Sequence, residues 1–158
     1  MSFVHSPRLL ALALVSIGGL LAFSGCESPS SMSGQNSIRT LTTSANSNWV
    51  LVSLVTADGV KQPVPASHAP SLTIGYQGRV SGNAGVNDYV GNATVADDHL
   101  SWGEQLASTR MAGAPELMAT ENLYLTALKA TTQITVNGDR LILTGHKPLR
   151  LEFVRANP

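Results

Sequence analysis

The chain has 158 residues, enough for one domain with appendages but hardly for two. Its ten basic and ten acidic residues balance to zero formal charge, so no basic face is expected to bind nucleic acid. The single cysteine excludes an internal disulfide, a CxxC redox pair and a cysteine-rich zinc cage.

Residues 1–25 have the pattern of a secretory signal peptide. Arg8 precedes an almost wholly apolar run over residues 9–23. A helix of this length rises roughly 22 Å, which is short for a hydrocarbon core of about 30 Å. The run is therefore typical of a signal-peptide core, and the small residues Ser24 and Gly25 follow it at the expected cleavage site.

The position of Cys26 decides among three roles for a lone cysteine: core filler, catalytic nucleophile or lipid anchor. The segment Phe23-Ser24-Gly25-Cys26 resembles a bacterial lipobox, although lipoboxes usually have Leu where this chain has Phe23. The resemblance implies that Cys26 becomes the new N-terminus and carries a diacylglyceryl anchor in the membrane. The alternative is an ordinary secreted protein that is cut nearby and keeps a free thiol.

Glu27 follows the expected anchor. In enteric bacteria Asp at this position signals inner-membrane retention, so Glu27 implies an outer-membrane lipoprotein that faces the periplasm. Inner-membrane retention and surface exposure stay open, because this sorting rule does not transfer reliably between lineages.

Residues 26–48 are interpreted as the lipidated cysteine and a flexible tether rich in Ser, Thr, Asn and Gly. Few large apolar side chains occur here, so burial cannot offset the entropy of ordering. About 20 flexible residues have an r.m.s. span on the order of 25 Å. The alternative is a segment that becomes ordered on a partner.

Residues 49–158 are expected to form one mainly β domain. The apolar run 49–55 predicts a strand, and the Pro-rich segment 62–70 predicts an irregular loop. Two pairs of short strands follow. Residues 71–74 and 79–82 are joined by a turn at 75–78, and residues 92–96 and 100–102 by a turn at 97–98. Asp97, Asp98 and His99 are interpreted as a solvated hairpin turn rather than a weak metal site.

The C-terminal third predicts an antiparallel meander of three strands. Residues 131–136 and 140–144 flank Asn137-Gly138, a pair that favours a type I′ hairpin turn. A second turn over residues 145–148 leads to a strand over 149–154. Apolar and charged residues alternate there, which predicts one dry and one wet face: Leu149, Leu151 and Phe153 against Arg150 and Glu152.

One helix is predicted from Pro115, which suits a first helical turn. Apolar residues then recur at helical spacing: Leu117, Met118, Tyr124, Leu125 and Leu128. Glu121 falls on the same stripe, where a carboxylate is costly without a partner. Two alternatives stay open: an ion pair with Arg110 that pins the helix to the sheet, or a position at the rim of the stripe, in water.

Two stretches are similar to motifs of the META domain family, also called HslJ-like. They are residues 80–91, VSGNAGVNDYVG, and residues 106–112, LASTRMA. A helix with a Glu and a final hairpin follow in the family's order, so the resemblance covers roughly residues 49–153. It implies an α+β fold that is mainly β: a compact, antiparallel, barrel-like sheet with one packed α-helix.

The resemblance also implies a binding or structural role for four motif residues: Asn87, Tyr89, Arg110 and Glu121. Many members have cysteine at the positions of Val86 and Gly113, so the covalent link that this implies between two loops is absent here. The loop over 82–91 is therefore expected to be more mobile. Its glycines are expected in tight turns or bulges, with a backbone-lined binding loop as the alternative: Gly82, Gly85 and Gly91.

The sequence carries no recognisable catalytic motif. A nucleophile elbow, a phosphate-binding loop and an HExxH zinc pair are all missing. Ser108 beside Arg110 has no identifiable base, and the histidines lie far apart in the sequence. We therefore expect no enzyme activity, no cofactor and no metal.

Three function classes remain. The resemblance implies a monomeric lipoprotein that serves envelope maintenance or the stress response by binding another envelope component. The second class is a barrel that binds a small apolar ligand or peptide through exposed aromatic side chains: Tyr76, Tyr89 or Trp102. The third is a proteinaceous enzyme inhibitor. A hydrophobic cavity would favour the ligand-binding barrel. A protruding loop with a charged tip would favour the enzyme inhibitor. A filled core would favour the envelope-maintenance lipoprotein.

Overall fold

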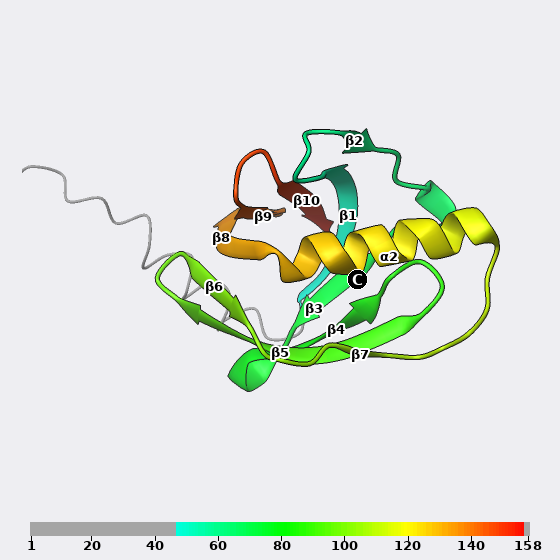
Figure 1. Cartoon of the computed structure of the whole chain (residues 1–158). Helices are drawn as coiled ribbons and strands as arrows, with labels where there is room; N and C mark the ends of the chain where they lie inside the picture. Colours follow the sequence, from blue (N-terminus) through cyan, green and yellow to red (C-terminus); the bar gives the residue numbers. More distant parts are fainter. Residues whose placement is uncertain (1–46, 157–158) are drawn as a thin grey trace, which may run out of the picture. The chain divides into compact units, whose positions relative to one another are not determined.

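The computed structural model describes residues 47–156, and eight of its strands form a closed antiparallel barrel (Figure 1). In their order around the barrel, these strands are β1 (Ser47–Val55), β3 (Ser71–Ile74), β4 (Arg79–Asn83), β5 (Asp88–Ala96), β6 (His99–Trp102), β8 (Thr131–Asn137), β9 (Arg140–Gly145) and β10 (Arg150–Arg155). Pairing of β1 with β10 closes the ring. The expected signal peptide, Cys26 and nearly all of the tether lie outside the described residues.

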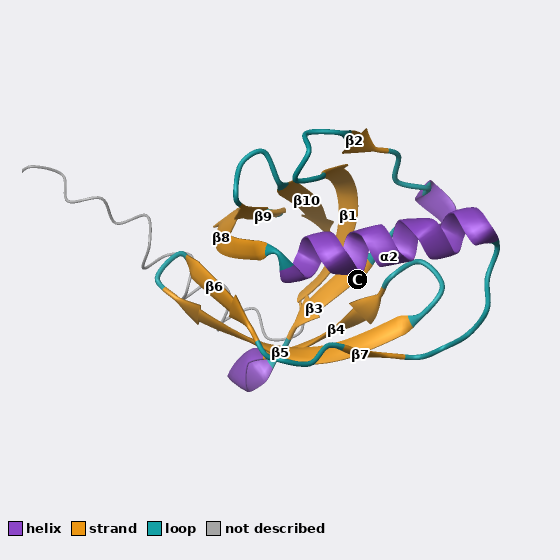
Figure 2. Ribbon diagram, viewed as in Figure 1, coloured by secondary structure: helices purple, strands orange, loops and turns teal. Residues whose placement is uncertain are grey.

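The prediction of a mainly β, barrel-like fold with one helix is confirmed (Figure 2). Two-residue strands were not predicted: β2 (Lys61–Gln62) beside β1, and β7 (Ala107–Ser108) beside β5. Strand β5 begins at Asp88, earlier than the predicted start at Asn92. Residues 88–91 pair with β4 throughout, so the expected loop over 82–91 shrinks to residues 84–87.

The barrel core consists of side chains that alternate inward along the strands. In β1, the pairing register with β10 shifts between Leu51 and Ser53, which marks a bulge. Leu51 and Leu54 are consequently both buried although three positions separate them. The bulge thus lets one long strand contribute to the core along most of its length.

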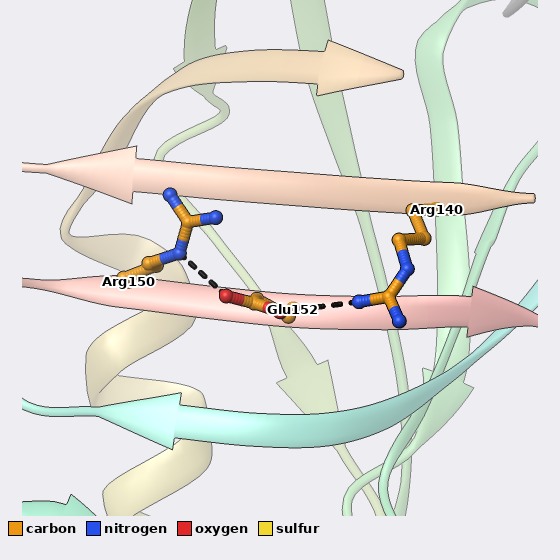
Figure 3. A network of polar contacts seen from close by, with 3 residues as sticks. All are labelled: Arg140, Arg150 and Glu152. Atoms are coloured by element: carbon orange, nitrogen blue, oxygen red, sulfur yellow. Dashed lines mark hydrogen bonds and ion pairs between the residues drawn. The ribbon is translucent and has the colours of Figure 1, made fainter. Parts of the chain in front are cut away.

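The outer face of β9 and β10 carries the predicted wet pattern. Glu152 lies between two arginines, with Arg150 Nε 2.6 Å and Arg140 Nη1 3.6 Å from its carboxylate oxygens (Figure 3). All three side chains are at least partly exposed, so the pairs contribute little to stability. We interpret this network as a solvated surface and not as a site.

The helix α2 (Pro115–Lys129) packs at one end of the barrel, called here the helix end. Its buried residues face the strands: Glu121, Tyr124, Ala127 and Leu128. The loop between β4 and β5 and the turn between β9 and β10 lie at the same end. Across residues 47–156, no helix combines the length and the apolar content needed to span a bilayer.

The opposite end is called here the open end. Because all neighbouring strands are antiparallel, the start of β1 lies there beside the end of β3, with Ser47 paired to Ile74. The 3₁₀ turn η2 (Tyr76–Gly78) and the turns after β5 and β8 also lie at this end. On the β1 and β10 side, the guanidinium of Arg155 covers the ring of Trp49 at 4.5 Å.

Candidate ligand-binding site

The predicted motif residue Glu121 is buried at the helix end, with only 4% of its surface exposed. Its Oε2 accepts hydrogen bonds from the backbone N–H groups of Asn87 at 2.7 Å and Val86 at 3.3 Å. Its Oε1 accepts a third hydrogen bond, from Asn87 Nδ2 at 2.9 Å. Three donors to a charged acceptor offset the cost of removing this carboxylate from water.

Both alternatives for Glu121 are therefore wrong. The carboxylate is not at the rim of the stripe, and its partners are amide groups rather than a guanidinium. Arg110 is exposed, and the ion pairs found within residues 47–156 do not include it. The donors come from the loop between β4 and β5. There the backbone N–H groups of Val86 and Asn87, which are consecutive, both point at one carboxylate oxygen.

Asn87 joins three segments through one buried side chain. Its Oδ1 accepts hydrogen bonds from Thr109 Oγ1 at 2.8 Å and from Met111 N at 2.7 Å. Its Nδ2 donates to Met111 O at 3.1 Å as well as to Glu121. We call Asn87 and Glu121 the clasp. Its polar atoms bond within the protein, which favours the structural alternative for these two motif residues over the binding one.

Tyr89 lies inside the barrel and is 1% exposed, so the prediction that it is an exposed ligand contact is wrong. Its hydroxyl lies 2.8 Å from that of Tyr124, and both hydroxyls lie within hydrogen-bonding distance of Ser71 O. Burial raises the pKa of both phenols well above the ordinary value. Gly82 makes room for this contact, because a Cβ there would lie 2.0 Å from Ser71 O.

Val86 and Gly113, the two positions at which the motif resemblance implies cysteine, are neighbours in space. A Cβ built on Gly113 would lie 2.8 Å from Cγ2 of Val86. Packing of Val86 against this glycine thus replaces the covalent link that the motif comparison implied. The contact lies beside the clasp, since Val86 and Asn87 are consecutive.

An apolar pocket of about 270 Å³ occupies the open end. Its lining comes from β3, β4, β5, β6, β8, β9 and η2: Leu72, Ile74, Gly75, Tyr76, Gln77, Gly78, Val80, Ala93, Thr94, Val95, Leu100, Trp102, Ile134 and Leu143. Among the predicted aromatic contacts, Tyr76 and Trp102 line the pocket and Tyr89 does not. Tyr76 is 70% exposed at the rim, whereas the barrel residues of the lining are largely buried.

The pocket can hold an apolar molecule but offers little chemistry. Tyr76 is the one titratable side chain in its lining. Within residues 47–156, no group of three or more His, Cys, Asp or Glu side chains is placed to hold a metal. Asp97, with φ of 55°, forms the tight β5–β6 turn, as the hairpin interpretation required.

A second hollow of about 320 Å³ lies between α2 and the segment after β1. It is more open to solvent than the first, and its lining includes the exposed Asp58. Neither feature favours retention of an apolar ligand. The open-end pocket is therefore the better candidate site.

Comparison with known proteins gives a family and a fold. A family model described as META domain matches residues 39–158. The chain is similar to a protein from Burkholderia xenovorans solved by NMR, with 27% identity, a TM-score of 0.64, and coverage of 75% of this chain and 88% of that one. No curated protein matches the chain.

Two further solved structures resemble the fold. One, also solved by NMR, is 24% identical to this chain with a TM-score of 0.52, and the match covers 69% of this chain and 88% of the other. The other, a crystal structure of a DUF4847 family protein from Bacteroides vulgatus, is 14% identical with a TM-score of 0.51, covering 72% and 95% respectively. At these identities the likeness concerns the fold alone.

The clasp predicts an asymmetry between two glutamates of α2. Glu121→Gln keeps the side-chain volume but places an NH₂ group against a donor, so we expect a loss of roughly 1–3 kcal/mol in the free energy of unfolding. Glu116→Gln removes an exposed charge from the first turn of the same helix, so we expect a smaller loss of about 0.3–1 kcal/mol. Urea unfolding followed by circular dichroism measures both. Equal effects would contradict a structural role for the clasp.

The contact between Val86 and Gly113 predicts an engineered disulfide. In the double variant Val86→Cys, Gly113→Cys, the new bond should form under oxidising conditions and raise the free energy of unfolding by about 2–4 kcal/mol. Unfolding with and without a reductant measures the gain, and Val86→Cys alone is the control. Free thiols at both engineered positions of the oxidised double variant, located by alkylation and mass spectrometry so that Cys26 is not counted, would show that the two loops are not neighbours.

Proposed function

We propose that this chain, which belongs to the META domain family, is a non-catalytic binding protein whose barrel holds a small apolar ligand in the open-end pocket. One observation carries the proposal: seven strands and turns place apolar side chains around about 270 Å³ of space. Ligand sites are typically concave, largely preformed and mostly apolar, with few polar groups. A filled core would instead have favoured the first class, an envelope-maintenance protein that binds another envelope component.

The polar groups of the pocket support binding rather than catalysis. Trp102 Nε1 donates to Thr131 Oγ1 at 3.0 Å, so the indole is held in place by the protein itself. The buried phenols of Tyr89 and Tyr124 bond to each other outside the lining. No nucleophile paired with a base faces the space, which is why we propose no reaction.

The second part of the proposal concerns location. Cys26 carries a lipid that holds the domain at the outer membrane, facing the periplasm, where the apolar ligand is an envelope component. The lipobox resemblance of residues 23–26 supports this anchor. A role in envelope maintenance or the stress response follows if the bound component depends on the state of the membrane.

Filling the pocket should abolish ligand binding. In Ala93→Phe, the new ring enters the pocket, and we expect benzene, an apolar probe, to bind at least tenfold more weakly, which is about 1.4 kcal/mol. The measurement is the shift of the Ile134 and Leu143 methyl resonances in the full-length chain, kept in a fluorinated surfactant that supplies no hydrocarbon.

The matched control for this variant is Ala96→Phe, at an exposed position on the same strand. It should bind benzene as the natural chain does. If benzene causes no shift in the natural chain, or equal shifts in all three proteins, the pocket is not a ligand site.

Lipidation predicts a covalent label on one residue. Bacteria grown with an alkyne-tagged palmitate should label the natural chain and the control Ser31→Ala, whereas Cys26→Ser should stay unlabelled. Mass spectrometry of the purified chain then places the label. Labelling of Cys26→Ser, or none in the natural chain, would contradict the anchor.

A further inference from the structure

The pocket opens beside the first residue of the barrel. Ser47 pairs with Ile74, and Ile74 belongs to the pocket lining. The strand β1 runs from there toward the helix end, so the described part of the chain begins at the open end. The pocket mouth and the attachment point of the N-terminal segment thus share one end of the barrel.

The lining has a polar rim and a dry interior. Tyr76 and Gln77 of η2 are exposed and lie at the mouth. The interior is aliphatic, and Leu72, Ile134 and Leu143 are at most 1% exposed. The pocket volume of about 270 Å³ equals that of about nine molecules of liquid water. The aliphatic walls, however, offer water few hydrogen-bond partners. A molecule with one polar end and one hydrocarbon end matches this arrangement.

From these two observations we propose that the pocket takes a single alkyl chain of a membrane lipid, which enters through the open end from the bilayer to which the proposed anchor holds the domain. The inference rests on the proposed function, because it specifies the ligand of the same pocket. The polar headgroup stays at the rim, and the alkyl chain lies among the aliphatic side chains.

The surface of the open end suits contact with a bilayer. Tyr76 projects from η2 with 70% of its surface exposed, and tyrosine favours the membrane–water interface. The exposed charges near the mouth have both signs, with Arg79 on one side of η2 and Asp97 and Asp98 in the adjacent turn. No particular headgroup charge is therefore selected, and phosphatidylcholine is a suitable probe.

The first experiment measures the dependence of affinity on chain length. Single-chain phosphocholines of increasing length, kept below micelle formation, are titrated into the full-length chain in the fluorinated surfactant. We expect the affinity to rise about fourfold per methylene, the equivalent of roughly 0.8 kcal/mol, and then to level off when the pocket is full. The Ile134 and Leu143 methyl resonances report binding.

The outcomes of this titration separate the two proposals. If benzene binds and the phosphocholines do not, or if their affinity ignores chain length, the lipid proposal fails and the apolar pocket stands. If neither binds, both fail. The natural chain alone decides these cases, so the result does not depend on whether a variant folds.

The second experiment tests the source of the alkyl chain. The full-length chain is placed in phosphatidylcholine nanodiscs whose acyl chains carry a spin label near their ends. The label should broaden the methyl resonances of Ile134 and Leu143 and spare Leu149 at the helix end. Ala93→Phe should lose this broadening, and Ala96→Phe should keep it.

Two results would overturn the proposal. Equal broadening in Ala93→Phe would mean that the domain only lies near the bilayer, without an acyl chain in the pocket. Absence of broadening in the natural chain would mean that bilayer lipids do not supply the ligand, even where soluble phosphocholines bind.

Discussion

A carboxylate inside a small barrel is acceptable only when the protein replaces the water around it. Here Glu121 is held by two backbone N–H groups and the amide of Asn87, and Asn87 in turn holds the segment at Met111. These bonds fix α2, the β4–β5 loop and the segment before the helix against one another. The Tyr89–Tyr124 contact then follows on the inner side of the same elements.

Closure of one end by α2 leaves the apolar pocket at the opposite end. The helix contributes Tyr124 and Leu128 to the core at the helix end, and it contributes nothing to the lining of the open-end pocket. Small side chains there leave space that no helix fills; Ala93 is one of them. The barrel therefore has one end devoted to stability and the other available for binding.

The sequence predicts the strands and the helix well, because alternation and helical spacing are local signals. It could not predict the hydrogen-bond donors to Glu121. Asn87 and Val86 lie 34 and 35 residues away in the sequence and reach the carboxylate only in the folded barrel. The position of Tyr89 was missed because its motif resembled a loop, although residues 88–91 pair with β4. The pocket was equally hidden, since its walls come from strands distant in sequence. Of the pocket lining, the sequence indicates only Tyr76 and Trp102, as candidate aromatic contacts.

Closure of the barrel has a consequence for the order in which the strands can pair. Strands β3 to β6 and β8 to β10 follow one another as hairpins and can pair as they emerge, whereas Trp49 of β1 pairs with Arg155 of β10. Loop closure over such a distance comes late, because its entropy must be overcome first. The closed barrel therefore cannot exist before residues 150–155 have been synthesised, and until then the preceding strands can pair only as an open sheet.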